Sequence, residues 1–410
     1  MERQSKETKH RKVRLTPPQT QFICSAPISL YVHVPFCKAK CNYCNFYSLP
    51  SDPSHKKNPF LSGYFDLIKT ELGTAVKNYY KNEKIKVRSI YFGGGTPSVM
   101  PAKFFEDSIG LIIRHFDIIN DPEITIEVNP ESARFEELKA LRNMGINRIS
   151  IGAQSFNNLV LKSAGRLHNK RDIFRSFEDA RKAGFENISI DIILGLPGQS
   201  VPSLKKEIKN LLDLSPEHIS AYMLNIEKGS KFYKSGQMLL PEEEIAYFYE
   251  LFCWKIVLSG YNHYEISNFA KPGFESRHNL NYWKRGEYIG LGPSASSFIR
   301  LKGPRGLIKE LRKTNEPDLK KYSRNLKKPD GFKEISVSEI LSKKDIINEE
   351  IFLSLRTSEG MPIEKITKFT DPEIINSAIN EGLMERKDDN LILTMRGMLL
   401  SSELFARIML

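Results

Sequence analysis

The chain has 410 residues, of which 40% are hydrophobic and 27% charged, as expected of a soluble protein with two or three folded domains. No uninterrupted apolar run approaches the ~18 residues of a membrane-spanning helix, and the opening MERQSKETKHRKVRL lacks the apolar middle of a secretory signal. These features predict a cytoplasmic protein, with peripheral association at a membrane left open. A mitochondrial presequence is disfavoured because Glu2 and Glu7 interrupt the basic run.

The formal net charge of +12 is concentrated in residues 1–15 and in Lys302–Lys328. Such charge can attract nucleic acid, a membrane surface or an acidic small molecule. Neither stretch interleaves its basic residues with aromatic ones as a nucleic-acid-binding surface would. We therefore expect no nucleic-acid partner and interpret both stretches as solvated.

A basic, flexible arm is expected over residues 1–26, and an alternation of short β-branched runs with longer amphipathic segments follows it. The predicted strands are Ser29–Val34, Val87–Phe92, Ile124–Val128, Arg148–Gly152, Ile188–Leu194 and His218–Leu224. The predicted helices are Tyr64–Tyr80, Ala102–Phe116, Phe135–Met144, Arg171–Ala183 and Val201–Leu214. This rhythm predicts an α/β fold, with helices covering a parallel sheet.

Six such units could form an open doubly wound sheet or a partial barrel. Polar or glycine-rich motifs follow nearly every predicted strand: PFCKAKC, GGGTPS, NPES, AQSF and GLPGQ. In a βα barrel these loops open on one face, where the chemistry is done, whereas a doubly wound sheet needs fewer of them, at one switch point. The loops therefore favour a partial (βα)6 TIM-like barrel over residues 27–300.

The pattern changes after the barrel. A helix near Glu242–Ser259 precedes the motif HNLNYW, and residues 301–334 are rich in Lys, Asn and Pro, which predicts a basic linker or insert. Residues 335–410 then show three helical patterns, two short strands and a last helix. Helices followed by a hairpin predict a small winged-helix-like α+β domain.

Three of the five cysteines lie within eight residues, as Cys37-x3-Cys41-x2-Cys44. Thiolates are soft ligands that suit iron–sulfur clusters, Cu(I) or zinc. A structural zinc site would need a fourth Cys or His, and the nearest imidazole, His33, lies before the loop. Three thiolates instead fit three corners of a cubane cluster whose fourth iron stays open. A Cys3His zinc site and incidental thiols are the alternatives.

The two remaining cysteines, Cys24 and Cys253, stand alone in apolar surroundings. We expect both to be small buried fillers.

The phrase YVHVPFCKAKCNYC, with CxxxCxxC in the loop after the first strand, resembles the radical S-adenosylmethionine (SAM) superfamily. Its flanking residues are similar to the branch that contains oxygen-independent coproporphyrinogen III oxidase and the haem chaperone HemW. The resemblance extends over about residues 28–300 and more weakly to the C-terminus. It implies a [4Fe–4S] cluster on Cys37, Cys41 and Cys44. It also implies a bound SAM, cleaved to a deoxyadenosyl radical when the cluster is reduced.

Several inward-facing or loop residues match SAM-contacting positions of that family. The GGGTP turn could be only a turn, but a turn of this kind can also expose N–H groups to a ligand carboxylate. Carboxylates and amides inside a barrel need partners, either in a structural polar layer or in a bound ligand, and an arginine can meet a ligand carboxylate. The positions are Tyr31, Tyr43, Gly94, Gly95, Thr96, Glu127, Gln154, Arg166 and Asp191.

Two features separate the haem chaperone from the oxidase. The oxidase branch has a fourth cysteine two residues after the third, where this chain has Phe46, and HNLNYW resembles the HNxxYW motif of the HemW-like branch. His278, Asn279, Tyr282 and Trp283 are therefore haem-binding candidates, although His278 and Trp283 could simply cap the barrel.

The leading hypothesis is a haem chaperone that carries haem as cargo to an acceptor protein, plausibly a respiratory membrane enzyme. The oxidase, an oxidoreductase that would make protoporphyrinogen IX, and another radical enzyme remain alternatives. Radical chemistry would need an electron donor, a homodimer is possible, and no catalytic residue is assigned.

Overall fold

The computed structural model describes residues 21–22, 26–50, 59–80, 84–302, 307–328 and 331–410. Six parallel strands form its centre, each followed by at least one helix before the next along the chain. The strands are β2 (Ile28–Val34), β5 (Lys86–Gly94), β6 (Asp117–Val128), β7 (Arg148–Gln154), β8 (Asn187–Leu194) and β9 (His218–Met223). The helices are α1 (Pro59–Tyr80), α2 (Ala102–His115), α3 (Phe135–Asn143), α5 (Lys170–Lys182), α6 (Val201–Leu214) and α8 (Glu242–Leu258). All the predicted strands and helices of this region are confirmed.

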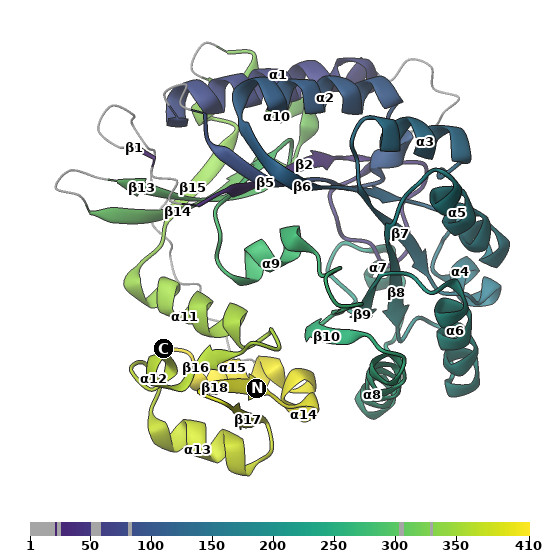
Figure 1. Ribbon diagram of the computed structural model, residues 1–410, viewed down its shortest axis with the longest axis vertical. Coiled ribbons are helices and arrows are strands. Elements are labelled where there is room, and N and C mark those ends of the chain that lie inside the picture. Colours follow the sequence, from purple (N-terminus) through teal and green to yellow (C-terminus); the bar gives the residue numbers. More distant parts are fainter. Residues whose placement is uncertain (1–20, 23–25, 51–58, 81–83, 303–306, 329–330) are drawn as a thin grey trace.

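The sheet continues beyond this core at both edges without closing into a full barrel. The strand order is β10-β11-β9-β8-β7-β6-β5-β2-β12-β13-β14-β15, so the sheet ends at β10 and β15. The added strands are β10 (Asn262–Glu265), β11 (Asn268–Ala270), β12 (Tyr288–Leu291), β13 (Ser296–Lys302), β14 (Ile308–Asn315) and β15 (Ser336–Ile340). Figure 1 shows the helices α1, α2, α3, α5 and α6 outside the curved sheet and α9 (Arg277–Trp283) inside it.

The central strands alternate in side-chain chemistry because their two faces meet different surroundings. On β2, Ile28, Leu30 and Val32 are fully buried in the main apolar core, which includes residues of the outer helices. The intervening Tyr31 and His33 face the other way, and Tyr31 lies in register with Tyr91 of β5. The inner face of the curved sheet is therefore the polar one.

Several short elements connect these layers. They are β1 (Gln21–Phe22), β3 (Phe36–Cys37), β4 (Leu49–Pro50), a 3-10 turn at Pro97–Val99, α4 (Asn158–Ser163) and α7 (Lys231–Lys234). Within the predicted arm, β1 pairs with β13, while residues 1–20 and 23–25, including Cys24, lie outside the described residues. Cys253 is 1% exposed in α8, as predicted.

Within the segment expected to be a basic linker or insert, residues 307–328 form regular elements that pack on the barrel. They include β14, which pairs with β13 and β15, and α10 (Leu319–Leu326). Tyr322 and Asn315 donate hydrogen bonds of 2.5 and 2.7 Å to the buried Glu71 of α1. The many lysines disguise this structure in the sequence, because its few apolar residues (Leu311, Leu319, Tyr322 and Leu326) are widely spaced.

The C-terminal part has its own apolar core and the predicted helices and hairpin. Its elements are α11 (Lys343–Ser354), β16 (Met361–Pro362), α12 (Ile363–Ile366), α13 (Pro372–Asn380), β17 (Met384–Lys387), β18 (Asn390–Leu393), α14 (Met395–Leu399) and α15 (Ser401–Ile408). One further strand, β16, has no signal in the sequence because it has only two residues, one of them a proline, and it pairs with β18. In the described part of the chain no helix has both the length and the apolarity to cross a membrane.

Candidate iron–sulfur and cofactor site

The loop that carries the three cysteines is held in place by backbone contacts with the loops after other strands. Its Asn42 N–H donates to the Ala164 carbonyl at 2.9 Å, and the Asn42 carbonyl accepts from Phe232 at 2.8 Å. The Asn42 side chain adds a 2.8 Å bond to the Ser163 carbonyl. Because α4 and α7 follow different strands of the sheet, these contacts fix the loop at the end of the curved sheet where the strands finish.

The three thiols lie close enough to affect one another. Cys37 is buried and Cys41 and Cys44 are half-buried. Burial raises the pKa of the Cys37 and Cys44 thiols, and the neighbouring Cys41 raises both pKa values further. Bound iron would favour the deprotonated thiolates that this environment otherwise opposes. Three soft sulfur donors on one loop suit an iron–sulfur cluster, and Cys37, Cys41 and Cys44 are the residues that would hold it.

His33 is not available as a fourth ligand. Its Nδ1 lies 3.0 Å from the Tyr31 hydroxyl and its Nε2 3.1 Å from the Tyr47 carbonyl. Burial lowers the pKa of this imidazole to about 4, so it stays neutral near pH 7. Within the described ranges, no three His, Cys, Asp or Glu side chains are grouped as around a single metal ion. These contacts give no support to a Cys3His zinc site.

The glycine turn after β5 packs directly against the cysteine loop. Gly94 has φ +116°, and a Cβ there would lie 2.6 Å from the His33 ring; a Cβ on Gly95 would lie 2.6 Å from the Phe36 carbonyl and 3.0 Å from the Cys37 sulfur. Only glycine fits where two backbones approach this closely.

Three N–H groups of the turn are used within the chain. They donate from Gly94 to Glu127 (3.1 Å), from Gly95 to Val34 (2.8 Å) and from Thr96 to Phe36 (2.7 Å). Glu127 of the neighbouring strand and the backbone around the cysteine loop accept these bonds, and the contact of the turn with a ligand carboxylate stays a prediction.

Two predicted carboxylates lie on the inner face of the sheet. Glu127 accepts a 2.8 Å hydrogen bond from Tyr91, and Asp191 accepts from the Ser150 hydroxyl at 2.9 and 3.0 Å. Burial raises the pKa of both groups, that of Glu127 to about 7. Gln154 ends β7 in a left-handed conformation, with φ 67°. These groups could bind a cationic ligand once the carboxylates are ionised.

Arg166 connects the cysteine loop with the ends of β6 and β7. Its Nη1 lies 3.2 Å from the Cys41 sulfur, and its Nη2 donates to Asn129 Oδ1 at 2.6 Å and to the Gly152 carbonyl at 2.7 Å. The half-buried Tyr43 lies nearby, since it and Cys41 both contribute to the raised pKa of Arg166. Both amino groups of Arg166 thus contact the chain, and its buried Nε has no hydrogen-bond partner in the part of the chain that the structure describes. Its contact with a ligand carboxylate stays a prediction.

Sequence reasoning missed two polar residues of this site. Asn129 donates to Thr96 Oγ1 at 2.9 Å and so joins the glycine turn to Arg166. Its only signal was its position in the NPES motif after a strand. Arg148, at the start of β7, is 2% exposed, and its Nε has no hydrogen-bond partner among the described residues. It counteracts the burial that raises the pKa of Glu127 and Asp191.

The HNLNYW motif forms α9, which lies against the inner face of the sheet. The buried carboxylate of Glu123 accepts the backbone N–H of Arg277 and of His278, both at 2.9 Å. An acidic group at a helix N-terminus stabilises it through unpaired N–H groups and the helix dipole.

His278 is 1% exposed, and both of its ring nitrogens have partners. Nδ1 lies 2.9 Å from the Ser89 hydroxyl and Nε2 2.9 Å from the Tyr282 hydroxyl. The ring thus forms a buried link between α9 and β5, as in the alternative that His278 caps the barrel, and haem binding by His278 stays a prediction. Asn279, Tyr282 and Trp283 are half-buried on the same helix, and Tyr282 borders a cavity.

The partial barrel and its three-thiol loop indicate a radical SAM protein, and comparison with known families agrees with this class. The family model for the radical SAM superfamily matches residues 31–211, and the model for the HemN C-terminal domain matches residues 341–400. Radical SAM family membership implies a [4Fe–4S] cluster and SAM.

Relatives narrow the class further. The chain is 36% identical to "Heme chaperone HemW" of Lactococcus lactis over 94% of its own length and 98% of the relative's. It is 34% identical to "Heme chaperone HemW" of Bacillus subtilis over 92% and 98% of the two lengths. The structure of coproporphyrinogen III oxidase (HemN) from Escherichia coli superposes with a TM-score of 0.77 at 23% identity, covering 93% of this chain and 90% of that one, which shows a shared fold. The chain therefore belongs to the HemW family of radical SAM proteins.

Proposed function

We propose that this protein is a haem chaperone that binds a [4Fe–4S] cluster and SAM and delivers haem to an acceptor protein. The observation that carries the proposal is its identity of 36% and 34%, over nearly the whole length, to two relatives named heme chaperones. The cluster is supported by three free cysteines on one loop, which lie near enough to shift one another's pKa. A haem acceptor, an electron donor and a second copy of the chain are partners that remain predictions, as is the cytoplasmic location.

The residues of the site have separable tasks in this proposal. Cys37, Cys41 and Cys44 would hold the cluster, and Arg166 places a positive charge beside it through Cys41. Glu127 and Asp191 would attract a cationic sulfonium ligand on the inner face. When bound and reduced, the cluster could supply an electron to SAM. The chain itself orients the ligand and excludes water from it.

Haem binding and porphyrinogen turnover separate this function from its main alternative. Purified, anaerobically reconstituted protein should bind haem with a stable absorbance change and release it to an apo-haem protein. Given SAM, a reductant and coproporphyrinogen III, the same preparation should make no protoporphyrinogen IX. Protoporphyrinogen formation would establish the oxidase, and failure to bind haem would overturn the chaperone.

The oxidase is kept as a second candidate because the fold is shared with HemN. One residue counts against it. Phe46 stands where the oxidase pattern has a fourth cysteine, and its side chain is 70% exposed beside the cysteine loop. A phenyl ring there cannot supply a thiol to the loop.

A further inference from the structure

A cavity of about 370 Å³ lies beside the proposed cofactor site, between the inner helix α9, the strands β12 and β13, and the C-terminal helix α11. Its volume falls within the range of ~300–1,000 Å³ typical of small-molecule sites. Four aromatic rings and two guanidinium groups line it: Tyr31, Tyr282, Tyr288, Phe298, Arg285 and Arg312. Tyr31 also contacts His33, which packs against the glycine turn, so the cavity adjoins the cluster loop.

The aromatic walls are held in fixed orientations. Tyr282 and Tyr288 meet edge to face with ring centroids 4.5 Å apart. The Tyr282 hydroxyl is held by His278 at 2.9 Å, which gives that buried imidazole a positioning task. Rigid aromatic surfaces favour a flat, apolar ligand, since stacking adds to the burial of area.

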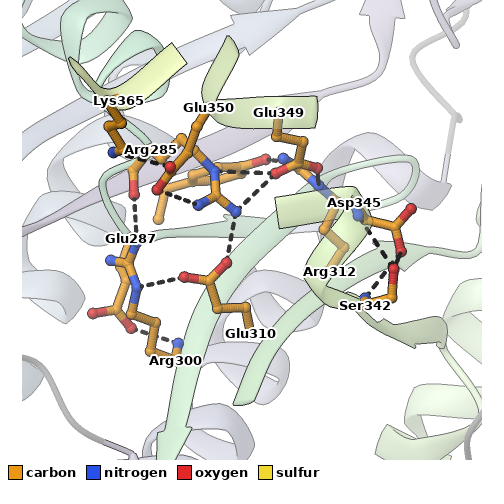
Figure 2. Close-up of polar contacts among 11 residues, drawn as sticks. Arg285, Glu287, Arg300, Glu310, Arg312, Ser342, Asp345, Glu349, Glu350 and Lys365 are labelled. Atoms are coloured by element: carbon orange, nitrogen blue, oxygen red, sulfur yellow. Dashed lines mark hydrogen bonds and ion pairs between the residues drawn. The ribbon is translucent and has the colours of Figure 1, made fainter. Parts of the chain in front are cut away.

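The guanidinium groups belong to an ion-pair network that is shown in Figure 2. Arg285 is 7% exposed and contacts Glu310 at 2.6 Å and Glu349 at 3.0 Å. Arg312 contacts the other oxygen of Glu349 at 2.7 Å and the Tyr288 hydroxyl at 3.2 Å. One carboxylate of α11 is therefore shared between Arg312 of β14 and Arg285 of the turn that connects α9 with β12.

Arg312 is the member of this network best placed to change partners. Its side chain is 34% exposed, compared with 7% for Arg285. Its guanidinium stacks at 5.4 Å on Phe298, a wall of the cavity. A planar guanidinium can exchange one carboxylate for another in the same paired geometry. A ligand carboxylate that enters the cavity could therefore replace Glu349 on Arg312.

Two backbone hydrogen bonds also join the C-terminal part to the opposite end of the sheet, at and just after β10. The backbone of Arg356 accepts from Ile266 at 3.0 Å, and Ser358 donates to Tyr264 at 3.0 Å. The C-terminal part thus contacts the β10 edge as well as the β12–β14 edge. It bridges the two ends of the open sheet, and α11 covers the cavity between them.

We propose that this cavity binds a planar aromatic dicarboxylate, a tetrapyrrole of the haem type. Its ring lies between the tyrosine and phenylalanine side chains, and one carboxylate is taken by Arg312 in exchange for Glu349. The inference rests on the proposed function and adds to it the place of the cargo and the part of α11 as a releasable cover. No iron ligand is assigned.

The test compares haem with haem dimethyl ester, which has the same ring and no ionised carboxylates, by absorbance titration of cluster-loaded protein. Arg312→Gln should weaken haem binding about tenfold or more, which is the range for losing one charge-assisted hydrogen bond. The affinity for the ester should stay unchanged. Leu353→Trp, which fills the cavity from α11, should weaken both ligands. Arg324→Gln and Lys344→Trp, at exposed positions of α10 and α11, are the matched controls and should bind as the wild type does.

The outcomes separate the two proposals. If the wild type binds haem and both cavity variants, with normal iron content and melting, bind haem equally well, the cavity is not the site. If Arg312→Gln weakens the binding of haem and of the ester alike, Arg312 does not exchange Glu349 for a carboxylate of the ligand. If the wild type binds no haem, the proposed function falls and the cargo site with it.

Discussion

Single residues decide whether the cysteine loop can hold its geometry. Gly95 is the sharpest case, because a Cβ there would lie 2.6 Å from the Phe36 carbonyl, and neither backbone can yield without moving Cys37. The sequence predicted the glycine turn as a ligand cradle. The approach of the two backbones could not be predicted, since it depends on how strands β2 and β5 lie side by side.

Gly95→Ala should therefore lower the iron and sulfide content after reconstitution, because the added methyl group displaces the Cys37 loop. Gly110→Ala is the matched control: Gly110 lies inside α2 with open space around its Cβ position. It should retain full iron content and gain about 0.5–1 kcal/mol in free energy of unfolding, as alanine does in a helix. Equal iron content in both variants would contradict the packing argument.

Glu127 should make SAM binding pH-dependent. Burial raises its pKa to about 7, above the 4.5 of an exposed glutamate. The folded protein therefore holds more protons than the unfolded chain between about pH 4.5 and 7, so this group's contribution to stability falls as pH rises through that window. The ionised form, which a sulfonium attracts, accumulates above pH 7.

The affinity of cluster-loaded protein for SAM should accordingly rise between about pH 6 and pH 8. Glu127→Gln should reduce this rise in affinity and weaken SAM binding at the higher pH by about tenfold. Glu106→Gln, at an exposed position of α2, serves as the surface control. A pH profile in Glu127→Gln identical to that of the wild type would rule out this role.

At the scale of elements, periodicity located the repeated βα units because strand and helix faces differ so clearly in polarity. It failed where few apolar residues carry the packing, as in β14 and α10. It also gave no sign that Ser89 of β5 holds His278 of α9 from 189 positions away in the chain. Contacts of that separation have no local signal.

The α11 cover depends on one shared carboxylate. Glu349→Gln should lower the thermal midpoint by a few degrees and increase proteolysis at the junction before α11, because it leaves two partly buried guanidinium groups with weaker partners. Glu364→Gln removes a pair on the exposed surface of α12 and should melt as the wild type does. Identical melting and cleavage of the two variants would show that α11 is held by other contacts.

For the molecule as a whole, the partial barrel brings every strand-end loop to one face, and this is why scattered motifs in the sequence predicted one site. The carboxylates of Glu127 and Asp191 lie on the inner face of the sheet, and the three thiols lie at the end of the sheet where the strands finish. The order of the added strands and the bridging C-terminal part could not be predicted, since both follow from long-range pairing at the two sheet edges.

The cluster is the claim on which the other proposals depend. The most direct test is iron, zinc and acid-labile sulfide analysis of anaerobically reconstituted wild type, Cys41→Ala and Cys253→Ala. A [4Fe–4S] centre predicts about four iron and four sulfide per chain in the wild type and in Cys253→Ala, whose thiol is buried in α8. Cys41→Ala should lose most of both. Zinc without sulfide in the wild type, or full iron and sulfide in Cys41→Ala, would contradict the account.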